Sequence, residues 1–71
     1  MVQNKVKYIN YCISCFSKQY DMSLLEAYNY LDRYGGIAFL NDCFVSEHLL
    51  SIEEALHDLI VICKNNGGGL I

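Results

Sequence analysis

Residues 22–36 read MSLLEAYNYLDRYGG and contain both a start signal and a stop signal for one helix. Ser23 and Glu26 have the spacing of a capping box, in which each side chain accepts a hydrogen bond from the other residue's backbone N–H. Gly35 can take the left-handed conformation that commonly ends a helix. We therefore predict a helix that begins at Leu24 and stops before Gly35.

The same start signal recurs at residues 51–54, which read SIEE. A further helix is therefore predicted from Ile52. Its end is predicted near Gly67, because Asn-Asn-Gly at 65–67 tolerates positive φ. Helical spacing of apolar residues predicts that it turns one stripe toward the core: Ile52, Ala55, Leu56, Leu59 and Cys63.

The segments on either side also have helical patterns. Apolar residues recur every three or four positions from Val2 to Tyr20, which predicts one long helix. The same spacing from Ile37 to Phe44 predicts a short helix that ends near residue 45 or 46. The chain has no proline to interrupt these helices. We predict an all-α fold, a compact bundle of about four short helices, with a single domain at 1–66 and a flexible C-terminal tail at 67–71.

The composition favours a folded protein that needs a partner. The chain has 71 residues, of which 54% are apolar and only 18% charged, unlike a disordered segment. A domain of this size buries only roughly 60% of its unfolded surface, so some apolar side chains must stay outside. We expect a protein partner or self-association, for example as a homodimer.

The expected location is the cytoplasm. No stretch approaches the ~20 apolar residues that span a bilayer, and the N-terminus, MVQNKVKYIN, lacks the pattern of a secretion signal. The four cysteines are then best interpreted as reduced thiols. No membrane association is predicted.

The charge distribution argues against nucleic-acid binding. Residues 1–20 carry three lysines and no acid, whereas residues 21–71 carry eight acids against Arg33 and Lys64. The segments 24–34 and 37–45 have the outline of a helix-turn-helix. However, its second helix offers no arginine or lysine to a phosphate backbone. We therefore expect no nucleic-acid partner.

Cys12 and Cys15 form a C-x-x-C pair, the spacing of half a zinc site or of a redox motif. A redox pair needs a helix N-terminus to lower a thiol pKa, whereas this pair lies in the middle of a predicted helix. A metal or redox protein that uses Cys12 and Cys15 is our alternative hypothesis, and a structural role for both thiols is preferred. The remaining candidate metal ligands form no second close pair: Cys43, His48, His57 and Cys63.

No set of residues predicts catalysis. Neither histidine accompanies a recognisable nucleophile, and no glycine-rich phosphate loop precedes a helix. His57 lies one turn after Glu53, as expected for an exposed helix position with a weak ion pair. We predict that the protein is not an enzyme, with no catalytic residue and no cofactor.

The candidate partner surface rests on tyrosines, which are enriched at protein interfaces. All six lie in residues 8–34. Helical projection puts Tyr8 and Tyr11 off the main apolar face of their helix. In the next helix it groups Tyr28 with Leu24 and Leu31, and it points Tyr30 elsewhere. The predicted partner-binding residues are Tyr8, Tyr11, Tyr30, His48 and Val61.

Several stretches resemble a family of short bacterial proteins of unknown function, DUF thirty-seven ninety-one. They are residues 28–37 (YNYLDRYGGI), Phe39-Leu40, His48 with Leu50-Ser51, and the segment from Asp58 to Gly68. His48 and the corner Tyr34-Gly35-Gly36 match the pattern best. In related families, such proteins are often encoded beside a larger protein that resembles an ADP-ribosyltransferase toxin. The resemblance thus implies an antitoxin or accessory role, and it supplies no catalytic residue.

Overall fold

The computed structural model describes residues 4–69, which form helices and contain no strand. This confirms the all-α prediction. The five helices in this range are α1 (Lys5–Gln19), α2 (Leu24–Arg33), α3 (Gly36–Asp42), α4 (Phe44–Glu47) and α5 (Ile52–Asn65).

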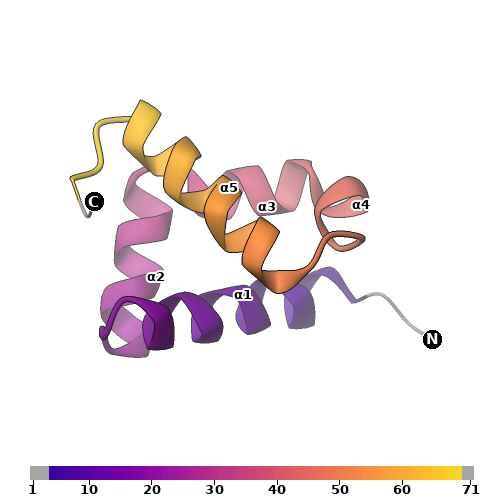
Figure 1. Cartoon of the computed structure of the whole chain (residues 1–71), viewed down its shortest axis with the longest axis horizontal. Helices are drawn as coiled ribbons and strands as arrows, with labels where there is room; N and C mark the ends of the chain where they lie inside the picture. The colour runs from indigo at the N-terminus through magenta and orange to yellow at the C-terminus, as the bar shows by residue number, and fades with distance from the viewer. Residues whose placement is uncertain (1–3, 70–71) are drawn as a thin grey trace.

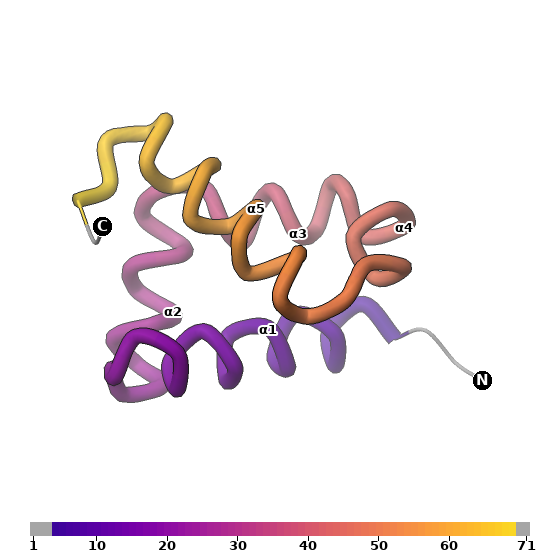
Figure 2. Tube along the Cα trace, in the orientation of Figure 1, coloured from indigo at the N-terminus to yellow at the C-terminus, as the bar shows by residue number. Residues whose placement is uncertain are grey.

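The helices are arranged as an open frame with one helix across it. In Figure 1, α1 runs along the bottom, α2 stands at the left and α3 returns along the top. α5 crosses this frame diagonally and packs against both α1 and α3. The trace in Figure 2 shows α4 at the far end from α2, joined to α5 by a short loop.

Both predicted capping boxes are present. The Glu26 backbone N–H donates to Ser23 Oγ at 3.0 Å, and the Ser23 N–H donates to Glu26 Oε1 at 2.8 Å. At the start of α5, Ser51 and Glu54 exchange the equivalent bonds at 3.2 Å each. The predicted starts at Leu24 and Ile52 are therefore confirmed.

The corner between α2 and α3 uses the predicted glycine. Gly35 has φ +84°, which ends α2 and immediately starts α3. The end of α5 is tied to this corner, since Asn66 Nδ2 donates to the Tyr34 carbonyl at 2.8 Å. A second left-handed glycine, Gly67 with φ +97°, follows α5 as predicted. Gly68 N–H then donates to the Cys63 carbonyl at 2.8 Å, and residues 70–71 of the predicted tail lie outside the described range.

The segment after the glycine pair differs from the prediction of one short helix. It forms two helices, because Cys43 has φ −108° and ψ 20° and so leaves the helical conformation. Bonding continues across the break, with Cys43 N–H donating to Phe39 O and Glu47 N–H donating to Cys43 O, both at 2.8 Å. The bend turns α4 so that Glu47 becomes a buried residue.

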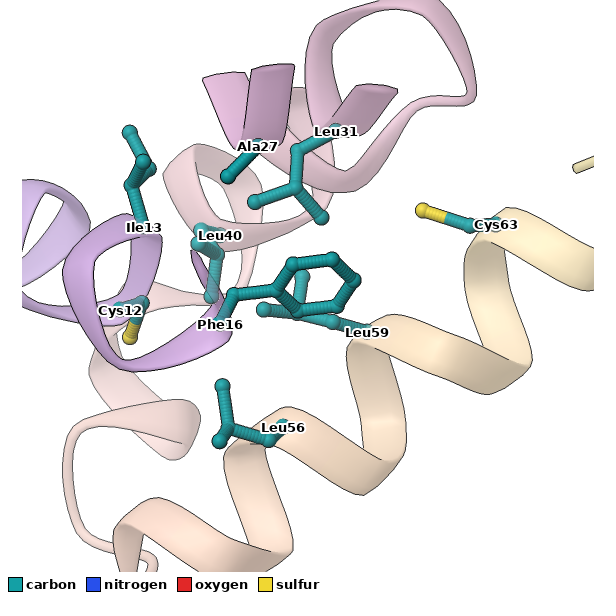
Figure 3. Packing of buried hydrophobic residues seen from close by; sticks show 9 residues of the cluster. All are labelled: Cys12, Ile13, Phe16, Ala27, Leu31, Leu40, Leu56, Leu59 and Cys63. Atoms are coloured by element: carbon teal, nitrogen blue, oxygen red, sulfur yellow. The ribbon is translucent and has the colours of Figure 1, made fainter. Parts of the chain in front are cut away.

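The core lies where α5 crosses the frame, as Figure 3 shows. The predicted stripe of α5 is confirmed except that Ile52 is only half-buried. In α1, Val6 is exposed although it follows the apolar spacing, and Val2 lies outside the described residues. The buried cluster consists of Cys12, Ile13, Phe16, Ala27, Leu31, Leu40, Leu56, Leu59 and Cys63.

The projection of α2 was wrong for its two middle tyrosines. Tyr28 is 44% exposed, whereas Tyr30 packs against the core with its ring 6.0 Å from the ring of Phe16. The buried residues Ala27 and Leu31 define the inner face. Tyr30 follows Ala27 by three residues and shares that face, while Tyr28 is adjacent and points about 100° away.

Candidate functional site

The predicted partner-binding residues occupy different parts of the molecule. Tyr8 and His48 come together, with ring centroids 6.5 Å apart. Val61 lies on α5 and is 40% exposed. Tyr11 is exposed on α1, and Tyr30 is packed against the core. The structure therefore gathers only part of the predicted surface, around α4.

An aromatic cluster surrounds α4 and consists of Tyr8, Phe44 and His48. The rings of Phe44 and His48 stack at 4.7 Å with an interplanar angle of 13°, and Tyr8 meets Phe44 edge-on at 5.6 Å. His48 Nδ1 lies 2.7 Å from the Phe44 carbonyl oxygen. Because a carbonyl can only accept, Nδ1 carries the proton and closes the end of α4. The short helix was predicted to end near residue 45 or 46, before His48; in the structure His48 is the C-cap of α4 and is half-buried.

Tyr8 ties this cluster to the helix α1. Its hydroxyl donates to the backbone carbonyl of Glu47 at 3.0 Å. Burial, with a hydrogen bond to Cys12, raises the pKa of Tyr8 above its ordinary value, so the phenol stays protonated and keeps donating. Tyr8 thus holds α4 in place and does not offer a free interface group.

Glu47 is a buried carboxyl group that the sequence did not reveal. It is 6% exposed, and its Oε1 has no hydrogen-bond partner among the described residues. Burial, a hydrogen bond with Asp58 and the charge of Asp58 together raise the pKa of Glu47 from 4.5 to about 7, and burial is the largest of the three causes. All three effects favour the protonated form. The only available signal was the spacing of Glu47 three residues after Phe44, on one face of a very short helix.

Glu47 and Asp58 line a hollow between α3, α4 and α5, which we call the acidic pocket. Its volume is about 400 Å³. Apart from the two acids, the wall is mainly apolar, and it includes Val61, one of the predicted partner-binding residues. The lining residues are Phe39, Cys43, Ser46, Glu47, Asp58, Val61 and Ile62.

A second hollow lies between α1 and α2 and is called the α1–α2 groove. Its volume is about 430 Å³, and no charged side chain lines it. Three large side chains of the groove are exposed to solvent: Leu24 is 60% exposed, Leu25 is 68% exposed and Tyr28 is 44% exposed. The groove lining is Asn10, Ile13, Ser14, Leu24, Leu25 and Tyr28.

The C-x-x-C pair is divided between the interior and the surface. Cys12 is fully buried and Cys15 is half-buried, and both are free thiols. Burial raises the pKa of Cys12 to about 11, which disfavours the thiolate that metal binding and redox exchange require. Within residues 4–69, no three His, Cys, Asp or Glu side chains are grouped as a metal site would need.

The comparisons with known proteins give a family and no activity. A family model described as "Protein of unknown function (DUF3791)" matches residues 7–66. This match covers most of the 71-residue chain and agrees with the resemblance noted in its sequence. No curated protein and no solved structure matches the chain. In the described part of the chain, none of the helices has the length and apolar character to cross a membrane.

Proposed function

The chain belongs to the DUF3791 family of proteins of unknown function, and on this premise we propose that it is a small protein-binding module and not an enzyme. The observation that supports this proposal is the α1–α2 groove. Leu24 and Leu25 are more than half exposed. This is unfavourable in a domain of this size, whose small apolar core leaves little stability to spare. A partner that covers these side chains would remove from water the apolar surface that the fold itself cannot bury.

The chemistry of the groove favours the apolar face of a partner helix. Its lining contains the buried residue Ile13, and uncharged polar groups come only from Asn10, Ser14 and the Tyr28 hydroxyl. Fully burying a leucine side chain is worth about 1.5–3 kcal/mol. A partner that covers Leu24 and Leu25 would provide more than half of this free energy at each, since each is more than half exposed. A few such anchors commonly supply most of the binding energy of an interface. The groove can therefore provide the centre of an interface.

We further propose that the partner is the toxin-like enzyme that the family resemblance implies, a protein resembling an ADP-ribosyltransferase. The module would then serve as its antitoxin or accessory subunit. We also propose that it acts in the cytoplasm, since its four cysteines are free thiols, as expected in a reducing compartment.

Co-expression with the product of the neighbouring gene tests the proposal. Leu25→Glu places a charge in the groove, and it should weaken the complex at least about tenfold. The helix should tolerate this change, because an acid is favourable in a first turn. Leu49→Glu is the matched control, since Leu49 is 77% exposed and lies outside the groove.

The two variants and the wild type separate the outcomes. Selective loss of the complex in Leu25→Glu supports the groove as the interface. Equal weakening by Leu25→Glu and Leu49→Glu, or no complex at ~100 μM protein, would contradict the proposal. A dimer in sedimentation that only Leu25→Glu dissociates would assign the groove to self-association instead of a toxin-like partner.

A further inference from the structure

The acidic pocket lies apart from the groove, and no residue lines both hollows. We propose that the acidic pocket binds the ammonium or guanidinium group of an organic cation, with Asp58 and Glu47 accepting its N–H groups and the apolar wall covering its alkyl stem. The inference goes beyond protein binding through the groove, because it assigns a second site and its ligand chemistry.

The first argument is the unmet hydrogen bond of Glu47. Its Oε1 is buried and has no donor among residues 4–69. Leaving a buried acceptor unpaired is unfavourable, and native proteins seldom do so without a reason. Glu47 belongs to the lining of the pocket, and in this proposal a turn of its side chain brings the oxygen to the ligand. The half-buried Asp58 offers the first contact.

The second argument is the sign of the charge. The wall carries two acids and no lysine, arginine or histidine. An anion would be repelled, and an uncharged apolar ligand would leave Glu47 Oε1 unpaired. A metal ion would find only two carboxyl groups, since no third ligand of the usual types is grouped with them in the described residues. A cation with several N–H donors is attracted by the two acids and also supplies the hydrogen bond that Glu47 Oε1 lacks.

The third argument is the rest of the wall. Phe39, Val61 and Ile62 supply apolar surface beside the acids. Alkylammonium and alkylguanidinium groups carry an apolar stem behind the charge and bury that stem on such surfaces. The volume of about 400 Å³ lies within the range of small-molecule sites. The ligand class is therefore an amine or guanidine on a short alkyl chain, either free or as a lysine or arginine side chain of a protein.

Binding should release a proton, because Glu47, with a pKa of about 7, is partly protonated near neutral pH. A bound cation favours the ionised form of Glu47, so affinity should rise with pH. Tyr8 and Cys12 do not reproduce this dependence, because burial raises the pKa of each well above neutral. The groups that face Glu47 are Tyr8 and Cys12 on α1, Cys43 before α4, His48 after α4 and Asp58 on α5.

The test titrates n-butylguanidinium into the full chain and follows the carboxyl ¹³C signals of Glu47 and Asp58 by NMR. A probe this small should bind with a dissociation constant on the order of 10 mM. With a Glu47 pKa of about 7, the affinity should rise about tenfold between pH 6 and pH 8. n-Butyltrimethylammonium has the same charge without N–H donors, and it should bind at least about tenfold more weakly.

Variants assign the effect to the pocket. Glu47→Gln should weaken n-butylguanidinium binding about tenfold and abolish its pH dependence, and Asp58→Asn should also weaken it about tenfold. Glu53→Gln is the matched control, because it removes one exposed acid from the same helix as Asp58 and does not line the pocket. Circular dichroism at each pH checks that the variants are folded. Glu47→Gln retains a neutral side chain of equal size, so its folding is expected.

The outcomes decide between support and rejection. No saturation of the carboxyl shifts, equal binding of the two cations, or equal effects of Glu47→Gln and Glu53→Gln would each overturn the proposal. A short acetylated peptide with one central arginine distinguishes the sources: tighter binding than n-butylguanidinium indicates a protein side chain, and weaker binding indicates a free small cation. Leu25→Glu should leave these titrations unchanged, so failure of the groove proposal would not be mistaken for failure of this one.

Discussion

Glu47→Gln should change how the stability of the protein depends on pH. The pKa of Glu47 is raised from 4.5 to about 7 by burial and by Asp58. Between these two values the folded protein keeps a proton that the unfolded chain releases. The contribution of Glu47 to the free energy of unfolding should therefore be largest below pH 4.5, and it should be lost as the pH rises through 7.

The magnitude follows from the same shift. Each pKa unit corresponds to about 1.4 kcal/mol, so the full shift contributes roughly 3 kcal/mol. Between pH 5 and pH 8 the loss should be about 2.5 kcal/mol, because part of the effect lies below pH 5. A domain of this length has a free energy of unfolding of roughly 4–10 kcal/mol, so the loss is a large part of the total.

Urea denaturation followed by far-UV circular dichroism at pH 5, 6, 7 and 8 measures this effect. Glutamine cannot ionise, so the difference between wild type and Glu47→Gln should change by about 2.5 kcal/mol across the range. Groups that the two proteins share cancel in this difference. Glu53→Gln serves as the control and should run parallel to the wild type. If the wild-type and Glu47→Gln curves were also parallel, the raised pKa of Glu47 would be refuted.

Three further substitutions test the fold, each by urea or thermal denaturation. Ser51→Ala removes the capping box of α5 and should cost about 1 kcal/mol, or about 4–8 °C in Tm; no change would mean that the box does not stabilise the helix. Leu59→Ala empties part of the core and should cost about 2–5 kcal/mol, whereas the exposed Leu25→Ala should stay within about 0.5 kcal/mol. Similar losses at both positions would contradict the assigned core. Gly35→Ala forces a side chain into φ +84° and should cost about 1–2 kcal/mol or more. Gly69→Ala, which meets no neighbouring atom, should be neutral within about 0.5 kcal/mol; an equally neutral Gly35→Ala would exclude the left-handed corner.

Much of the fold could be predicted from the sequence because its helix boundaries depend on neighbours three or four residues apart. The capping boxes at Ser23 and Ser51 formed as predicted, and Gly35 and Gly67 took positive φ. These are local bonds and local backbone conformations, so they need no knowledge of tertiary packing.

The candidate sites were less predictable because they depend on which face a helix turns inward. The spacing of α2 did not decide between Tyr28 and Tyr30, since each lies beside the buried stripe. Packing against Phe16 placed Tyr30 inside and left Tyr28 in the α1–α2 groove. Glu47 gave only the weak signal of its spacing after Phe44, because a single acid in a short helix is ordinarily exposed.

The sequence by itself determined the helix starts, the glycine stops and most of the core stripe of α5, because short-range hydrogen bonds and apolar spacing specify them. Only the tertiary structure decided the break at Cys43 and the burial of Glu47 beside Asp58. The contact that holds this arrangement, Tyr8 to the Glu47 carbonyl, joins residues 39 positions apart. Such a contact exists only after the frame of α1, α2 and α3 has formed, so no local pattern could specify the acidic pocket.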